Sequence, residues 1–196
     1  MKRICVFCGS SPGAVPEYKE AAQQLGRALV DKNIGLVFGG GRVGMMGAIA
    51  QTVMQSGGEV IGIITKALAE REVAFTEITD LRVVDSMHSR KALMVELSQG
   101  FIALPGGLGT IEEFFEVLTW GQLGIHQKPC GLLNVKGYFD KLMGFIDHTA
   151  GEQFVEKEHH SMILLDDTPA GLLHQFETYE PPQIDKAKRA IHLASS

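Results

Sequence analysis

The sequence has few of the features that mark membrane, secreted or nucleic-acid-binding proteins. It contains no run of about 18 apolar residues, so we expect no segment to span a membrane. Its three cysteines are an odd number and fit a reducing cytoplasm better than a disulfide framework. The formal net charge of −5 at pH 7 argues against a nucleic-acid partner. A phosphorylated ligand would therefore be held by a local pocket and not by the overall charge.

Several common catalytic motifs are missing or incomplete. No G-x-x-x-x-G-K-[ST] occurs, which excludes a Walker-type ATPase. The segment Gly9–Gly13 has the spacing of a hydrolase nucleophile elbow, but Pro12 lacks the N–H that an oxyanion hole would need. Residues 156–160 contain two histidines but no H-E-x-x-H, so we interpret them as a solvated polar stretch and expect no metal site. Cys5 and Cys8 are expected on opposite faces of one strand, as small buried side chains.

Short apolar runs alternate with longer amphipathic segments along most of the chain. This alternation predicts an α/β fold, doubly wound and Rossmann-like, with a parallel sheet of about seven strands and helices on both faces. We expect a single domain over residues 1–180, followed by a tail or frayed helix over residues 181–196. The expected strands are 3–7, 35–38, 60–64, 81–84, 101–104, 129–133 and 162–165, and the expected helices are 16–31, 44–56, 87–99, 110–123, 138–150 and 168–179.

Three of the expected strands end in glycine-rich loops. Ligands of doubly wound folds bind beyond the carboxyl ends of the strands, so Ser10, Gly40 and Gly41 are candidate ligand contacts. The run Gly39–Gly44 also satisfies G-x-G-x-x-G, a dinucleotide fingerprint. The acid that such a site needs is misplaced, because Glu59 precedes its strand instead of ending it. A smaller nucleotide fits these loops better than a dinucleotide.

The third glycine-rich loop lies in the most informative stretch, residues 104–113. It follows an apolar strand and leads into a helix that we expect to open at Thr110. Glycines allow a ligand to approach the backbone, and the N–H groups of the helix start attract an anion. A phosphate is the expected occupant.

The run Thr110–Glu113 has two interpretations. As T-x-x-E it fits a capping box, in which Glu113 would reach back to the Thr110 N–H. Alternatively, the Glu113 carboxylate faces the ligand that the loop binds. Spacing alone does not separate these roles.

A pair of cations opens another expected helix, which starts at Met87 with Asp85 or Ser86 as its N-cap. Arg90 and Lys91 lie where the helix dipole disfavours positive charge. They are therefore either a pair that faces a ligand or an acid, or a solvent-facing pair. The position at the end of an expected strand favours the ligand.

These motifs together resemble the LONELY GUY family, the cytokinin riboside 5′-monophosphate phosphoribohydrolases, some of whose bacterial members carry a "lysine decarboxylase" label. The resemblance extends to about Asp166 and implies a Rossmann-like homodimer that cleaves the N-glycosidic bond of a nucleoside 5′-monophosphate. It implies AMP as a further substrate and no metal or organic cofactor. The motifs that carry it are Cys8-Gly9-Ser10-Ser11, Gly39-Gly40-Gly41, Arg71-Glu72, Met87-His88-x-Arg90-Lys91, Pro105-Gly106-Gly107-x-Gly109-Thr110-x-x-Glu113 and Thr119-Trp120-x-Gln122-Leu123-Gly124-Ile125-His126-x-Lys128-Pro129.

The resemblance also implies roles for individual residues. Arg90 and Glu113 match the family's catalytic pair. Leu108 replaces a common aromatic residue, which removes no polar group. The region of Trp120 and residues 114–115 is a candidate subunit contact. The positions that match substrate contacts are Glu72, Lys91, Gly107, Leu108, Gly109, Thr110, Ile111, Glu112, Glu113 and Thr119.

Two other functions compete with this one. A non-catalytic nucleotide or cofactor-carrier protein on the same fold would bind AMP and release no adenine. The carboxylate of Glu113 argues against it, because a phosphate binder gains nothing from a second anion. A pyridoxal-phosphate decarboxylase is a weaker rival, since no lysine lies in a recognisable cofactor context.

Overall fold

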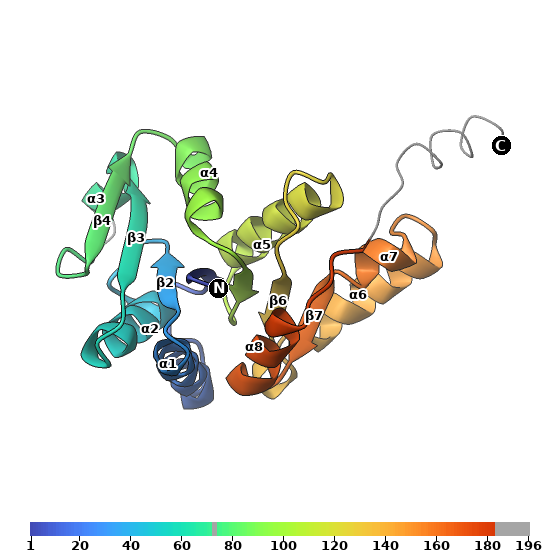
Figure 1. Ribbon diagram of the computed structural model, residues 1–196, viewed down its shortest axis with the longest axis horizontal. Helices are drawn as coiled ribbons and strands as arrows, with labels where there is room; N and C mark the ends of the chain where they lie inside the picture. The colour runs from blue at the N-terminus through green and yellow to red at the C-terminus, as the bar shows by residue number, and fades with distance from the viewer. Residues whose placement is uncertain (72–73, 183–196) are drawn as a thin grey trace.

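The computed structural model describes residues 1–71 and 74–182, and its centre is a parallel seven-stranded sheet (Figure 1). The strand order is β4-β3-β2-β1-β5-β6-β7, so the predicted doubly wound α/β fold is confirmed. The strands are β1 (Arg3–Phe7), β2 (Gly35–Phe38), β3 (Val60–Thr65), β4 (Asp80–Val84), β5 (Phe101–Ala103), β6 (Cys130–Leu133) and β7 (Ile163–Asp166).

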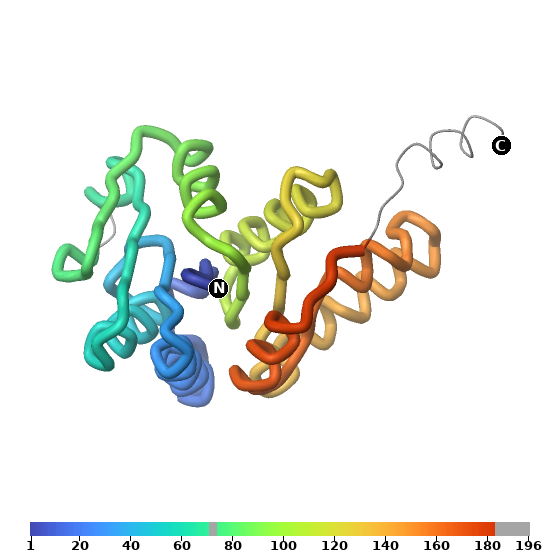
Figure 2. Tube along the Cα trace, in the orientation of Figure 1, coloured from blue at the N-terminus to red at the C-terminus, as the bar shows by residue number. Residues whose placement is uncertain are grey.

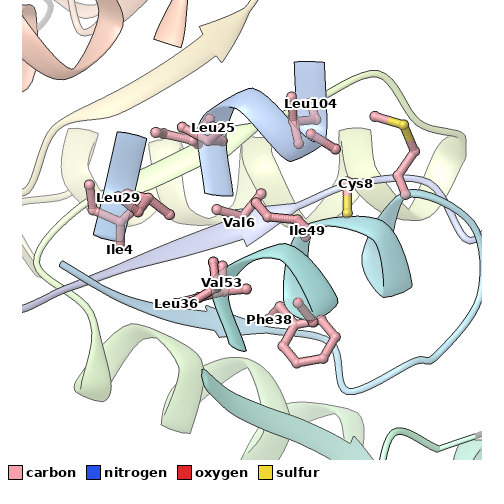
Figure 3. Close-up of a cluster of buried hydrophobic side chains, with 14 of the residues drawn as sticks. Ile4, Val6, Cys8, Leu25, Leu29, Leu36, Phe38, Ile49, Val53 and Leu104 are labelled. Carbon is pink, nitrogen blue, oxygen red and sulfur yellow. The ribbon is translucent and has the colours of Figure 1, made fainter. Parts of the chain in front are cut away.

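Helices cover both faces of the sheet, as Figures 1 and 2 show. Side chains of α1, α2 and α8 pack in one buried cluster, and those of α4, α5 and α6 pack in another. Figure 3 shows the first cluster, in which Leu25 and Ile49 lie over Val6 of β1. The helices are α1 (Pro16–Asp31), α2 (Gly44–Gln55), α3 (Lys66–Arg71), α4 (Met87–Leu97), α5 (Leu108–Gln122), α6 (Asp140–Gly151), α7 (Lys157–His160) and α8 (Pro169–Glu177), with a 3₁₀ turn η1 (Val135–Gly137).

The central strands are buried on both faces, which is why their sequences are continuous apolar runs. Cys5 packs in the α4–α5 cluster and Cys8 in the α1–α2 cluster, so their predicted placement on opposite faces is confirmed. All three cysteines are free thiols.

The interpretation of residues 156–160 as a solvated stretch holds for the exposed Lys157 and Glu158 but is wrong for His159. Residues 157–160 form α7, and the His159 side chain is only 6% exposed. His160 Nε2 lies 2.6 Å from Asp147 Oδ1 and ties α7 to α6. Short, charged helices such as α3 and α7 give no apolar periodicity, which is why the sequence did not predict them.

One part of the expected subunit contact is also wrong, because Phe114 is fully buried in the core of this chain. Phe115 and Trp120 are half-buried on the same helix. The expected tail, residues 181–196, lies outside the described residues except for Pro181 and Pro182. Within the described ranges, the structure has no helix long and apolar enough to cross a membrane.

Candidate active site

The site lies where β1, β2 and β5 end next to one another at the carboxyl edge of the sheet. The loop after β1 is tied to both neighbouring loops. Gly9 N donates to Pro105 O at 3.2 Å, and Gly9 O accepts from Met45 N at 3.0 Å. A Cβ on Gly44 would collide with the backbone of Ser10, so glycine permits this close contact. The sheet topology therefore brings together the loops that the sequence singled out.

The helix after β5 begins at Leu108 and not at Thr110 as expected. Gly107 is its N-cap, with φ −89° and ψ −157°, and no side chain of the described residues caps it. Thr110 therefore lies inside the first turn, and the capping-box interpretation of Glu113 is wrong. The exposed N–H groups and the helix dipole remain directed at the cavity described below.

The glycines of this loop serve two purposes. A Cβ on Gly106 would collide with Thr110 Oγ1, so packing requires glycine there. A Cβ on Gly107 or Gly109 would meet nothing within 4 Å, and neither residue has a positive φ. The chain's own packing does not require glycine at positions 107 and 109, which fits a backbone that a ligand approaches closely.

Arg90 is 6% exposed and is held by three acceptors from three elements. Ser86 caps α4 by accepting from Ser89 N at 3.1 Å, which sets the start of the helix that carries Arg90. The guanidinium of Arg90 donates to the Ile63 carbonyl at 2.9 Å, to Glu113 Oε1 at 2.7 Å and to the Gly39 carbonyl at 3.5 Å. A Cβ on Gly39 would collide with this guanidinium. Three acceptors and the cap of α4 thus fix the position of the Arg90 guanidinium at the site.

Glu113 is the carboxylate that faces this cation. Its side chain is 14% exposed, and burial raises the pKa of the Glu113 carboxyl above its usual value. The charge of Arg90 and its hydrogen bond to Glu113 offset part of that rise in pKa. A carboxylate that is buried but paired in this way can act as a base or stabilise a positive charge.

A cavity of about 350 Å³ opens beside this pair and the start of α5. Its size is in the range of small-molecule sites. Cys8, Met46, Leu68 and Met87 give it an apolar part. The remaining lining residues are Gly9, Ser10, Arg90, Gly107, Leu108, Gly109, Thr110, Glu112 and Glu113.

A family model described as "Possible lysine decarboxylase" matches residues 46–176. A cytokinin riboside 5′-monophosphate phosphoribohydrolase of Arabidopsis thaliana is 51% identical over 180 residues, which are 92% of this chain and 83% of the relative. A "Probable cytokinin riboside 5'-monophosphate phosphoribohydrolase" of Oryza sativa subsp. japonica is 50% identical, over 92% of this chain and 72% of the relative. The chain belongs to this phosphoribohydrolase family.

A more distant likeness concerns the fold alone. The molybdenum cofactor carrier protein of Chlamydomonas reinhardtii superposes with a TM-score of 0.69 over 90% of this chain and 96% of the carrier. Its sequence identity is 18%, which shows a shared architecture and nothing about the ligand.

Most of the predicted site residues of this family member meet at the cavity. Arg90 and Glu113, the predicted catalytic pair, and all predicted contacts from Gly107 to Thr110 line it, together with Ser10 and Glu112. Lys91 lies beside it and is 14% exposed, with its ammonium 2.7 Å from Glu112 Oε1 and 2.9 Å from Glu116 Oε1. Arg90 and Lys91 therefore each face an acidic side chain, which was one of the alternatives that the sequence left open for this pair.

Other predicted contacts lie elsewhere. Gly40 has φ +80° and packs on Ile64 of β3, and Gly41 forms a bridge with Ala74, so both shape the loop outside the cavity lining. Ile111 packs against the α4–α5 cluster, and Thr119 is exposed further along α5. Glu72 lies outside the described residues.

Sequence reasoning missed several groups that the structure brings to the site. The backbone carbonyls of Gly39 and Ile63 could not be predicted as contacts, because every residue type has a backbone carbonyl. Leu68 was missed because it lies on helix α3, which the sequence did not predict. Met87 was visible as the first residue of the motif that contains Arg90, but its apolar side chain suggested no contact.

Proposed function

We propose that this chain hydrolyses the N-glycosidic bond of cytokinin riboside 5′-monophosphates, the class that its relatives' names specify, to free base and ribose 5-phosphate. The observation that carries the proposal is the buried Arg90–Glu113 pair, 2.7 Å apart, in a cavity that also contains a helix N-terminus. The helix start suits the phosphate, and the carboxylate suits a sugar that becomes positively charged as its base leaves.

The phosphate would bind at the start of α5. The N–H groups of residues 107–110 are the donors, and the helix dipole adds to their attraction. The open space beyond the α-carbons of Gly107 and Gly109 lets the phosphate approach the backbone. Binding at this point fixes the ribose relative to Glu113.

Glu113 would act on the reacting carbon. As the bond between C1′ and the base nitrogen breaks, positive charge develops on the ribose ring and the carboxylate stabilises it. A water molecule attacks C1′ and gives one proton to Glu113. The departing base takes up one proton from solvent and Glu113 returns its proton to solvent, so the net reaction consumes one water and regenerates the carboxylate. Burial raises the pKa of the Glu113 carboxyl, which makes its carboxylate a better base than an ordinary glutamate.

Arg90 would act through its charge and not as a proton donor, because a guanidinium stays protonated. It balances the negative charges of the phosphate and Glu113. Its bonds to the carbonyls of Ile63 and Gly39 hold it in place before substrate binds.

The proposal extends to AMP as a substrate, to a homodimer and to a cytoplasmic location. The polar groups of the cavity would bind the phosphate and the ribose, and AMP has both of these in common with the prenylated nucleotides. Thr119 is exposed on α5 outside the cavity, so it would reach a substrate only from a neighbouring subunit. The half-buried side chains of Phe115 and Trp120 lie on the same helix.

The test is to incubate the purified protein with AMP and with isopentenyladenosine monophosphate, and to resolve the free base by chromatography. Glu113→Gln is compared with Glu20→Gln, the same change at an exposed position of α1. We expect base release by the wild type and by Glu20→Gln. Glu113→Gln should bind AMP but lose about a hundredfold or more in turnover, as for removal of an acid–base group.

Two results would contradict the proposal in different ways. A folded Glu113→Gln protein with full activity would remove Glu113 from the chemistry. A wild-type protein that binds AMP stoichiometrically and releases no adenine would favour the carrier alternative.

A further inference from the structure

A second cavity, of about 300 Å³, lies next to the active-site cavity and is lined in part by the loop that follows β5. It shares Gly9, Ser10 and Gly107 with the active-site cavity, so these residues border both cavities. Tyr138 belongs to the second cavity, and its hydroxyl donates to the Gly106 carbonyl at 2.6 Å. Tyr138 thus contacts this loop from the second cavity, whose lining does not include Glu113.

A left-handed turn after β6 delivers Tyr138 to this position. Lys136 has φ +53° and Gly137 has φ +69°, which reverses the chain before α6. Asn134 stabilises the turn, because its side chain accepts from Phe139 N at 2.8 Å and donates to Asp140 at 2.7 Å. Side-chain bonds therefore specify the turn that carries Tyr138.

The ring of Tyr138 is fixed by two edge-to-face contacts. Its centroid lies 5.5 Å from that of Tyr18 on α1 and 5.0 Å from that of Phe139. An ion pair of 2.8 Å between Lys136 and Glu17 also links the turn to α1. The hydroxyl is therefore held at a defined distance from the loop even though the ring is partly exposed.

The bond to Gly106 controls the direction of the next amide. The carbonyl of Gly106 and the N–H of Gly107 belong to one planar trans peptide and point in opposite directions. With the carbonyl turned toward the Tyr138 hydroxyl, the N–H of Gly107, which lines the active-site cavity, points away from Tyr138. This N–H is the first donor of the proposed phosphate site.

A peptide between two glycines is weakly constrained by its own side chains. The bond from Gly9 N to Pro105 O restrains the preceding peptide and not this one. If the peptide between Gly106 and Gly107 flipped, its carbonyl would face the phosphate and repel it. We propose that Tyr138 is a positioning residue that keeps this peptide in the anion-binding orientation.

A polarisation effect acts in the same direction. A peptide whose carbonyl accepts a hydrogen bond donates more strongly through its N–H. The inference rests on the proposed function insofar as the ligand at Gly107 is the 5′-phosphate of a nucleotide. The titration with inorganic phosphate in its test does not depend on turnover.

The test uses Tyr138→Phe, which keeps both ring contacts and removes the donor. Tyr18→Phe is the matched control, since it removes a hydroxyl from the other ring of the same pair. Calorimetry measures the affinity for inorganic phosphate and for AMP, and steady-state kinetics measures kcat, KM and inhibition by adenine. We expect phosphate and AMP to bind about fivefold more weakly to Tyr138→Phe, the usual effect of losing one neutral hydrogen bond.

The kinetic signature separates positioning from general damage. The other N–H groups at the start of α5 still hold the phosphate, so weakening one donor should affect the ground state and the transition state alike, and KM for AMP should rise while kcat stays within about twofold. Inhibition by adenine, which has no phosphate, should not change. An unchanged phosphate affinity, an equal loss of adenine inhibition, or the same losses in Tyr18→Phe would overturn the inference. If the wild type releases no base from AMP, the proposed function fails, but the phosphate titration still decides the role of Tyr138.

Discussion

At the scale of single residues, two opposing effects act on the pKa of the Glu113 carboxyl. Burial raises the pKa of its carboxyl, and the Arg90 guanidinium at 2.7 Å lowers it again. The result is a carboxylate that is more basic than a surface glutamate but still has a fixed cationic partner. Such a group can accept a proton at a higher pH than an ordinary glutamate without losing its orientation.

This balance predicts the pH dependence of the reaction. The protonated carboxyl can neither accept a proton nor stabilise the ribose cation, so kcat/KM for AMP should fall as the pH falls through the pKa of Glu113. Because that pKa is raised, the decline should begin at a higher pH than for an ordinary glutamate. The measurement is kcat/KM for AMP across the acid range.

The control is the residual activity of Glu113→Gln over the same range. The substrate phosphate also titrates near pH 6, and this contribution is common to both proteins. The fall in kcat/KM at low pH that is due to Glu113 should therefore be absent from the variant. The fall that is due to the substrate phosphate should remain. Identical acid limbs in both proteins would assign the decline to the substrate alone.

The sequence identified Arg90 and Glu113 through their motifs but not their contact. They are separated by 22 intervening positions, and both the capping box and the catalytic role fitted the spacing of Glu113. The start of the helix decided between them, because Gly107 and not Thr110 is the N-cap. The third acceptor of Arg90, the Gly39 carbonyl, could not be predicted, since every residue has a carbonyl.

At the scale of elements, the N-terminus of α5 carries the proposed phosphate site. No side chain within the described part of the chain caps it, and Leu108 in its first turn is 90% exposed. An uncapped helix start costs stability, because its N–H groups lack partners within the chain. The phosphate of a substrate would supply those partners.

A substitution in this first turn should separate stability from binding. Gly109→Ala places a methyl group where the chain itself has no contact within 4 Å, and alanine favours the helix by about 0.5–1 kcal/mol. We expect a slightly higher free energy of unfolding together with about a tenfold increase in KM for AMP, because the methyl group obstructs the phosphate. Denaturant unfolding and steady-state kinetics measure the two effects.

Gly144→Ala in α6 is the matched control. Its added Cβ also meets nothing within 4 Å, but it lies outside the lining of the active-site cavity. It should stabilise the protein by a similar amount and leave KM unchanged. An unchanged KM in Gly109→Ala would argue against a phosphate at the start of α5.

The elements differed in how far the sequence predicted them. Long helices with an apolar face, such as α1 and α2, were placed within one residue at each end. Helices α3 and α7, of six and four residues, were missed because they are too short to show a period. The turn that positions Tyr138 was missed as well, since left-handed Lys136 carries no signal in its residue type.

At the scale of the whole molecule, the site follows from the topology. β1 lies between β2 and β5, and the helices that follow β1 and β5 pack on opposite faces of the sheet. The loops separate at this point and leave a crevice, which is the usual ligand site of a doubly wound fold. The alternation of strands and helices, with glycine-rich loops at three strand ends, was therefore enough to predict where the cavity lies.

A homodimer should be visible in solution as a species of twice the 21.3 kDa chain mass. Thr119→Arg introduces a bulky charge on the exposed face of α5, so it should shift the protein toward monomer without unfolding it. Gln24→Arg, at an exposed position of α1, is the control and should remain dimeric. Sedimentation equilibrium and far-UV circular dichroism measure mass and folding.

If Thr119→Arg sediments like the wild type, α5 is not the subunit contact. A monomeric wild type would contradict the homodimer itself. Either result leaves the cavity and its Arg90–Glu113 pair within one chain.

The thiol of Cys8 in the cavity wall has a consequence for handling the protein. Burial, with the charge of Glu113, raises its pKa well above the usual value, so almost none is thiolate at neutral pH. Alkylating agents and mild oxidants react with thiolates, and the other two cysteines are more deeply buried and also have raised pKa values. The folded protein should therefore tolerate iodoacetamide and air without inactivation, and labelling of its cysteines should report unfolding.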